Sequence, residues 1–235
     1  MATRKIIRKG DQDALKQRVA LAAVDAVTPS LSAGAIIGVG TGSTANYFID
    51  ALARLKDRFE AAVASSLASA ERLAAHGVRV IDLNDAETIA VYVDGADEVE
   101  PGGALVKGGG GAHTREKIVA AAAERFICIV DESKEVATLG AFGVPVEMIP
   151  MARRSVAGRL RALGGEVRER AGFVTDNGNA IFDLHGLAIP DPYALEAQIN
   201  NLAGVVENGI FAVDRPDLVL VGSLEGVREF TPLRE

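Results

Sequence analysis

The sequence contains no tryptophan, a single cysteine, and no apolar run approaching the ~20 residues that a helix needs to cross a bilayer. One cysteine, Cys128, excludes a disulfide within the chain and is typical of a reducing cytosol. It lies inside the apolar run FICIV, which favours a core residue over a nucleophile. The N-terminal stretch MATRKIIRKGDQD lacks the apolar region of a secretory signal. We therefore expect a cytoplasmic protein with no membrane partner.

Positive charge is also scarce. Lysine and arginine number 25 against 32 aspartate and glutamate residues, which gives a formal net charge of −7. An acidic chain without a basic cluster is a poor candidate for binding nucleic acid, so we expect no nucleic-acid partner. The three histidines, His76, His113 and His185, are scattered and no two have the spacing of metal ligands. We expect each of them at the surface or in a turn, and no metal site.

Apolar residues are plentiful, at 49 %, and most of them fall in short runs that alternate with helical patterns. The runs predict strands at 35–39, 62–65, 78–81, 89–93 and 126–130, and helices at 11–27, from 43 to about 55, at 68–76 and at 114–124. Strands that alternate with helices predict an α/β fold, a Rossmann-like, mostly parallel sheet with helices on both faces.

The pattern changes after about residue 142. Strands are predicted at 144–149, 166–170, 180–184 and 205–211, with helices at 152–163 and 192–202 and a hairpin turn at 175–179. This β-α-β-β-α-β order is that of a smaller α+β, ferredoxin-like unit. The run at 217–221 is expected to return to the first sheet. We therefore predict a catalytic domain of residues 1–143 and 214–235, and a small domain of residues 144–213.

Four polar clusters follow predicted strands of the first sheet. They are Thr41–Thr44, Ser65–Ser66, Asp94–Asp97 and Asp131–Lys134. Because ligands of parallel α/β sheets bind at the carboxyl ends of the strands, we expect these clusters to meet at one edge.

The first cluster belongs to the loop GVGTGST, residues 38–44. Its glycine spacing is not the G-x-G-x-x-G of dinucleotide-binding loops, and Ser65-Ser66 stands where a ribose-binding acid would be expected. A phosphate or polyol contact fits better, since a helix N-terminus favours an anion. The alternative is a tight turn with Thr44 as the helix N-cap.

The stretch from Asp94 to Lys117 combines acids, a cation and exposed backbone amides. Asp94 and Asp97 could act in acid–base chemistry, form the loop, or, with Glu98, ligate Mg²⁺, although no histidine partner or regular acid spacing supports a metal. The segment KGGGG that Lys107 opens is no Walker loop, and its amides could form an oxyanion site.

A helix is expected to start at Thr114-Arg-Glu-Lys, with Thr114 as its N-cap. Glu116 could compensate the helix dipole or act as a general base that removes a proton next to a carbonyl. Lys134 could be a solvated lysine or a second cation at the edge of the sheet. The spacing leaves these alternatives open.

Six segments together resemble the ribose-5-phosphate isomerases of the A type. They are GVGTGSTA (38–45), YVDGADEVEP (92–101), LVKGGGGAHTREK (105–117), FICIVDESK (126–134), VPVEMIPMA (144–152) and TDNGN (175–179). The resemblance implies an aldose–ketose isomerase that interconverts ribose 5-phosphate and ribulose 5-phosphate in the pentose phosphate pathway. It further implies no metal or organic cofactor, a sugar phosphate as the small-molecule partner, and a homodimer or homotetramer.

The resemblance also assigns roles to residues. Glu116 is implied as the base that moves the proton between C1 and C2, Asp94 and Asp97 as acids for sugar hydroxyls and ring opening, and Lys107 as the cation for an enediolate oxygen. The implied substrate-binding set is Thr41, Gly42, Ser43, Thr44, Asp94, Gly95, Ala96, Asp97, Lys107, Gly108, Gly109, Gly110 and Lys134. Lys16 is a weaker match for a phosphate contact. His113 replaces an apolar residue of many relatives, and we assign it no catalytic role.

Two rival functions remain at this point. One is a sugar-phosphate-sensing module, but the N-terminal 34 residues show no convincing helix-turn-helix with a basic second helix. The other is a different aldose–ketose isomerase or a sugar-phosphate deaminase.

Overall fold

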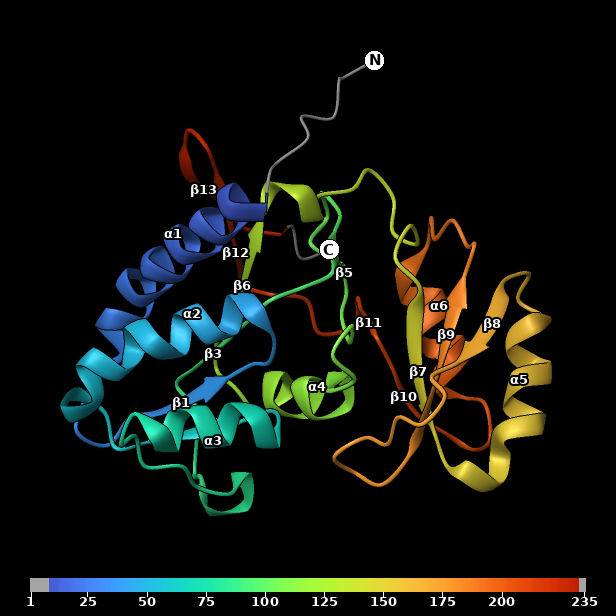
Figure 1. The fold of residues 1–235 in the computed structure, drawn as a ribbon, viewed down its shortest axis with the longest axis horizontal. Coiled ribbons are helices and arrows are strands. Elements are labelled where there is room, and N and C mark those ends of the chain that lie inside the picture. The colour runs from blue at the N-terminus through green and yellow to red at the C-terminus, as the bar shows by residue number, and fades with distance from the viewer. Residues whose placement is uncertain (1–8, 233–235) are drawn as a thin grey trace.

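A six-stranded sheet forms the centre of the larger part of the molecule (Figure 1). The computed structural model describes residues 9–232. The sheet order is β13-β12-β6-β3-β1-β2, and only β13 runs antiparallel to its neighbour. The strands are β1 (Ile36–Val39), β2 (Ala61–Ala64), β3 (Val91–Asp94), β6 (Phe126–Asp131), β12 (Leu218–Ser223) and β13 (Gly226–Phe230). The mostly parallel α/β fold is confirmed, including the return of the chain to this sheet at β12.

Helices cover both faces of this sheet, as predicted. They are α1 (Lys9–Val27), α2 (Ser43–Leu52), α3 (Leu67–Ala75) and α4 (His113–Ala121). Helices α1 and α2 pack with Ile37 and Val39 in one core cluster, whereas α4 packs with Ile36 in another. Because successive residues of a strand face opposite sides, the apolar run of β1 fills both cores.

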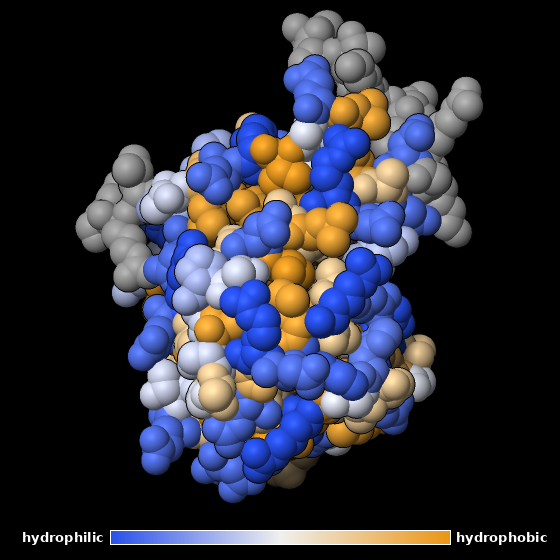
Figure 2. All heavy atoms as spheres, turned by 90° about the vertical axis from the view of Figure 1, so that its left-hand side faces the viewer, coloured by the Kyte–Doolittle hydropathy of each residue, from blue (hydrophilic) through white to orange (hydrophobic). Residues whose placement is uncertain are grey.

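Helix α2 shows why the sequence folds this way locally. Its buried residues, Ala45, Phe48, Ile49 and Leu52, recur at the spacing of one helical face. Figure 2 looks onto the side where α1 and α2 lie, and there apolar surface alternates with charged side chains. No helix within residues 9–232 has both the length and the apolar character that spanning a membrane requires.

The second sheet has the order β10-β7-β9-β8 and is antiparallel throughout. Its elements are β7 (Val144–Met148), α5 (Arg153–Arg161), β8 (Glu166–Glu169), β9 (Ala180–His185), α6 (Pro192–Asn200) and β10 (Val205–Asn208). Both helices pack on it through buried residues such as Leu160 and Ile199. The predicted β-α-β-β-α-β unit is confirmed, while the division of the chain into two domains at 144 and 213 stays a prediction.

A third sheet was not predicted. It has three short strands in the order β11-β5-β4, namely β4 (Glu98–Val99), β5 (Leu105–Val106) and β11 (Ile210–Phe211). The predicted single strand at 205–211 is therefore wrong, because the chain leaves one sheet for another at Gly209. The Gly209 N–H donates to the Pro145 carbonyl at 2.8 Å, and its own carbonyl accepts from the Lys107 N–H at 2.8 Å.

Two smaller differences concern the first sheet. The predicted strand at 78–81 reduces to one isolated bridge between Val80 and Ala62, and the edge strand β13 was not predicted. Short 3₁₀ helices connect several elements, at Thr28–Ser30, Ala53–Arg58, Leu83–Asp85, Glu132–Lys134 and Pro150–Ala152.

Candidate active site

A cavity of about 110 Å³ lies at the carboxyl ends of β1 and β3. It is lined by Lys16, Thr41, Gly42, Ser43, Thr44, Gly95, Ala96, Asp97, Lys107, Gly108, Gly109, Gly110, Glu116 and Lys134. The structure thus brings together every residue of the predicted substrate-binding set except Asp94, which is fully buried next to Lys107. A larger cavity, of about 740 Å³, lies beside α4 and α6, but none of the predicted site residues lines it.

Three buried charged groups meet at the wall of the smaller cavity. The Lys107 Nζ lies 2.7 Å from Asp94 Oδ2 and 3.2 Å from Glu116 Oε2, and it also donates to the Gly95 carbonyl. Burial by itself would lower the pKa of Lys107, but the two carboxylates outweigh it and raise that pKa above its ordinary value. Lys107 therefore remains a cation inside the protein.

Asp94 is held by three hydrogen-bond donors and by its ion pair with Lys107. Its Oδ1 accepts from the backbone N–H groups of Thr41 and Gly95, at 3.0 and 2.7 Å, and its Oδ2 accepts from the Tyr92 hydroxyl at 2.5 Å. A Cβ at Gly40 would lie 1.9 Å from Asp94 Cγ. The first glycine loop must therefore have glycine at position 40 so that this carboxylate can fit against it.

Glu116 has the most unusual environment of the three. Burial raises its pKa from 4.5 to about 8, the nearby Asp94 carboxylate adds to the rise, and Lys107 opposes it. Although Glu116 Oε2 is within ion-pair range of Lys107, the two atoms do not have hydrogen-bond geometry, and this oxygen has no hydrogen-bond partner within the described chain. A buried carboxyl that lines a cavity and has an oxygen without a hydrogen-bond partner is suited to taking up a proton.

The glycine segment after Lys107 is shaped by two close approaches. Gly108 has φ +101°, and a Cβ there would lie 2.8 Å from His113 Nδ1. The Gly109 N–H donates to Asp97 Oδ2 at 2.8 Å, so Asp97 fixes the segment across the cavity. This explains the run of glycines physically: the backbone itself forms the cavity wall.

The opposite end of the cavity is cationic and rich in donors. The Lys16 Nζ donates to the Ser43 hydroxyl at 3.0 Å, Lys134 lines the same space, and α2 begins directly after Gly42, which has φ +112°. Backbone N–H groups at a helix N-terminus together with lysine side chains favour a phosphate.

Two of the four predicted polar clusters only support the site. Ser65 and Ser66 do not line the cavity; their hydroxyls lie 2.8 and 2.9 Å from the Thr41 hydroxyl. Asp131 is fully buried and caps its own turn by accepting from Ser133 N–H at 3.0 Å. The four clusters thus lie at one edge of the sheet, as expected, but of these two only Lys134 reaches the cavity itself.

The predictions for the start of α4 also need correction. The N-cap of this helix is Ala112, not Thr114, and Thr114 instead donates to the buried Glu147 at 2.5 Å. His113 was expected at the surface but is fully buried, with its Nε2 3.3 Å from the Glu207 carbonyl. Burial lowers the pKa of His113 to about 4, so it is neutral near pH 7. Thr44 likewise does not cap α2, whose N-cap is Gly42.

Sequence reasoning missed Gly40 and Tyr92, which hold Asp94 in place. Gly40 could have been noticed because it precedes Thr41 in the loop, but Tyr92 lies inside an apolar strand and gave no signal. No group of three or more potential ligands among His, Cys, Asp and Glu is placed to hold a metal ion within residues 9–232.

This arrangement can hold a small anion and move a proton on it, because a carboxyl with a pKa near neutrality, a buried ammonium and the backbone of the glycine segment surround one space. Fold and site thus define an α/β enzyme with acid–base chemistry. The family model described as ribose 5-phosphate isomerase A (phosphoriboisomerase A) matches residues 61–226. The chain belongs to the ribose-5-phosphate isomerase A family, whose members are isomerases of the pentose phosphate pathway.

Individual relatives agree over nearly the whole chain. A ribose-5-phosphate isomerase A from Bordetella avium (strain 197N) is 56 % identical over 220 residues, which cover 94 % of this chain and 98 % of that protein. The crystal structure of ribose 5-phosphate isomerase A from Neisseria gonorrhoeae superimposes with a TM-score of 0.90 at 46 % identity, covering 95 % of this chain and 98 % of that one. A D-ribose-5-phosphate isomerase in complex with phospho-erythronic acid has a TM-score of 0.87 at 37 % identity, covering 93 % and 98 %.

Proposed function

We propose that the chain interconverts D-ribose 5-phosphate and D-ribulose 5-phosphate through a cis-enediolate, with Glu116 as the base. The observation that carries this proposal is the buried Glu116 carboxyl, which lines the cavity and whose Oε2 lies 3.2 Å from the Lys107 ammonium without a hydrogen bond. Membership of the ribose-5-phosphate isomerase A family supports the substrate.

The phosphate binds at the cationic end of the cavity. Charge and donors are supplied there by Lys16, Lys134 and the start of α2 at Gly42–Thr44. The relative solved with phospho-erythronic acid, a four-carbon phosphorylated acid, supports a phosphorylated sugar of this size as the ligand. With the phosphate at this end, the sugar carbons extend toward Lys107 and Glu116.

Asp94 and Asp97 take different parts in this proposal. Asp97 lines the cavity and handles the sugar hydroxyls during ring opening, with its second oxygen engaged by Gly109. Asp94 has no exposed surface, and its oxygens already accept from Thr41, Gly95 and Tyr92. Its part is therefore to hold Lys107 in place.

The isomerisation needs one proton to move between two neighbouring carbons. Glu116 takes the proton from C2 of the open-chain aldose, and the electron pair of that bond forms the C1–C2 double bond while the carbonyl oxygen at C1 becomes an oxyanion. Lys107 and the glycine-segment amides stabilise this charge. The O2 proton passes to O1, O2 becomes the carbonyl oxygen, and Glu116 returns its proton to C1. One carboxylate suffices because both carbons lie on one face of the planar enediolate.

Steady-state kinetics of Glu116→Gln test the proposal. Removing a general base lowers kcat by about 10²–10⁴-fold, while KM for ribose 5-phosphate changes little because the phosphate contacts remain. Glu124→Gln, at an exposed glutamate just beyond the same helix, serves as the matched control and keeps the parent rate. If Glu116→Gln isomerised ribose 5-phosphate at near the parent rate, the proposed base would be wrong.

Hexose phosphates assayed in parallel separate this function from that of another aldose–ketose isomerase. We expect turnover of ribose 5-phosphate to exceed theirs. The cytoplasmic location stays a prediction from the single cysteine and the N-terminal stretch, and the homodimer or homotetramer stays one from the family resemblance.

A further inference from the structure

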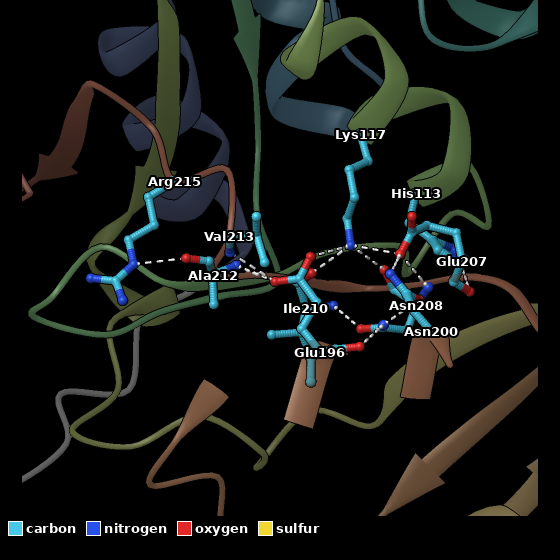
Figure 3. A network of polar contacts seen from close by, with 10 residues as sticks. All are labelled: His113, Lys117, Glu196, Asn200, Glu207, Asn208, Ile210, Ala212, Val213 and Arg215. Carbon is cyan, nitrogen blue, oxygen red and sulfur yellow. Dashed lines mark hydrogen bonds and ion pairs between the residues drawn. The ribbon is translucent and has the colours of Figure 1, made fainter. Parts of the chain in front are cut away.

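Lys117 follows Glu116 on α4 but takes no part in the cavity. Its ammonium is surrounded by oxygen atoms at the start of β11 (Figure 3). Nζ is 2.7 Å from Glu196 Oε1 and 2.8 Å from Glu207 Oε1, and it donates to the carbonyls of Asn208 and Ile210 at 3.0 and 2.7 Å. The side chain is only 10 % exposed, so these four contacts replace its hydration.

The two carbonyls that Lys117 binds flank Gly209, and Gly209 holds the backbone of Lys107. The Lys107 N–H donates to the Gly209 carbonyl at 2.8 Å. A Cβ at Gly209 would lie 2.2 Å from the Lys107 carbonyl oxygen, so the two backbones are in direct contact. Lys117 therefore connects the helix of the proposed base to the chain segment that carries the proposed oxyanion cation.

The rest of the network makes this segment rigid. The second oxygen of Glu196 accepts from the N–H groups of Ala212 and Val213, at 2.7 and 2.9 Å. The Asn208 side chain accepts from Ile210 N–H at 3.0 Å and donates to the Glu196 carbonyl at 3.1 Å. These contacts fix the backbone on both sides of Gly209, and Figure 3 shows Glu196, Asn208 and Ile210 gathered below Lys117.

An aromatic contact joins the two lysines as well. The ring centroid of Phe211 is 4.8 Å from Lys117 Nζ and 5.5 Å from Lys107 Nζ. Phe211 is fully buried on β11, beside the strand that leads into Lys107. A displacement of β11 would therefore change the surroundings of both ammonium groups.

We propose that Lys117 is a positioning residue: by binding the carbonyls on both sides of Gly209, it sets the distance between Lys107 and Glu116. This inference rests on the proposed function, in which those two residues stabilise the enediolate and move the proton. Loss of the Lys117 ammonium lets the segment at Gly209 move away from α4 and carries Lys107 with it.

The consequence can be read from the groups that face Glu116. Asp94 and Asp97 raise the pKa of Glu116, Lys107 lowers it, and the neutral Tyr92 hydroxyl lies on the neighbouring strand. When Lys107 moves away, its ammonium stabilises the ionised form of Glu116 less, so the pKa of Glu116 rises further. The pH at half-maximal kcat/KM moves upward by about one unit for a displacement of about 1 Å.

Two variants test the inference in the full-length enzyme. Lys117→Met removes the ammonium at constant side-chain length but leaves Glu196 and Glu207 without their cation. Lys117→Met/Glu196→Gln also removes the charge of the more deeply buried carboxylate, whose side chain is 3 % exposed against 19 % for Glu207, and the glutamine oxygen can still accept from Ala212 and Val213. For both we expect kcat to fall about 10–100-fold, with KM for ribose 5-phosphate within about threefold of the parent, together with the upward shift of the pH profile.

A control variant separates positioning from general loss of stability. Leu160→Ala removes core packing under α5 but none of the polar contacts of Lys117, and it should lower the unfolding temperature while leaving the pH profile in place. If the double variant is folded by thermal unfolding and keeps the parent kcat and pH profile, or merely matches Leu160→Ala, the positioning role is overturned. Failure of the proposed function gives a different result, namely an active Glu116→Gln enzyme.

Discussion

Glu116 is subject to two opposing influences on its pKa. Burial and the Asp94 carboxylate raise it, whereas the Lys107 ammonium lowers it, and the balance lies at about 8 instead of 4.5. A carboxyl with a pKa near neutrality can both accept and return a proton at physiological pH. The two neighbouring charges therefore tune the residue for the proton transfer that we propose.

The pH dependence of the reaction follows from this balance. Only the ionised form of Glu116 can remove the C2 proton, so kcat/KM should rise with pH and level off above about 8. The measurement is a pH–rate profile of the free enzyme with ribose 5-phosphate. A profile that levels off near the ordinary glutamate pKa of 4.5 would contradict the role of burial.

The same residue makes stability depend on pH. The pKa of Glu116 is about 8 in the folded protein against 4.5 for an exposed glutamate, so the folded state keeps a proton that the unfolded state has lost. Ionisation therefore destabilises the fold progressively as pH rises from 4.5 to about 8. Glu116→Gln cannot ionise, and its unfolding temperature relative to the parent should increase across this range. A difference that stays constant with pH would contradict the raised pKa.

Lys134 belongs to the anchoring end of the site, where it lines the cavity with Lys16. Lys134→Met should raise KM for ribose 5-phosphate about tenfold or more, with kcat within a few fold, because a phosphate contact contributes equally to ground state and transition state. The control is Lys56→Met. In the parent protein the Lys56 ammonium lies outside the cavity and donates to the His76 carbonyl at 3.3 Å. An unchanged KM would remove Lys134 from the phosphate site.

At the scale of elements, the loop between β1 and α2 has two separate tasks. Gly42 and the following residues present the N-terminus of α2 to the cavity, whereas Gly40 leaves room for the Asp94 side chain. The strand β3 and this loop are thereby fitted to each other, and Lys107 is placed by that fit. A glycine of the anchoring loop thus acts on the catalytic end of the site.

Gly40→Ala tests this fit. The added Cβ would lie 1.9 Å from Asp94 Cγ, so Asp94 must shift, at a cost of about 1–3 kcal/mol in the free energy of unfolding. We expect kcat to fall more than KM rises, since Lys107 loses its partner. Gly34→Ala is the control, because its Cβ would have nothing within 4 Å. Equal kinetics for the two variants would show that Asp94 can move without consequence.

At the scale of the whole molecule, three sheets contribute to one site. The parallel sheet supplies Asp94 and the anchoring loop, the three-stranded sheet supplies Lys107, and the antiparallel sheet fixes Gly209 through Pro145. Several elements thus hold Lys107 in place. In the proposed mechanism its ammonium stabilises the enediolate in the way that a metal ion does in other enzymes.

A chelator experiment follows from that arrangement. We expect incubation with excess EDTA and its removal to leave kcat and KM for ribose 5-phosphate unchanged, since Lys107 supplies the positive charge next to Glu116. Restoration of lost activity by a divalent cation would contradict this prediction. Lys107→Met should in contrast lose most of kcat under both conditions.

Much of the fold and the site could be predicted from the sequence because the relevant signals are local. Apolar runs followed by helical periodicity indicate parallel strands and crossover helices, and the Asp94–Lys117 stretch holds most of the chemistry in consecutive residues. The prediction failed where distant contacts decide. Gly209 divides a predicted strand because its backbone bonds to Pro145 and Lys107. Thr114 was predicted as a helix N-cap, but its hydroxyl donates to Glu147 instead.

The sequence by itself determined the class of fold, the family, and which residue types gather at the carboxyl ends of the strands. Only the tertiary structure decided that Glu116 is buried beside Lys107, that Asp94 is buried against Gly40, and that Lys117 joins α4 to the segment around Gly209. The physical reason is that a pKa and an ion-pair distance depend on groups far apart in the chain, which no local pattern records.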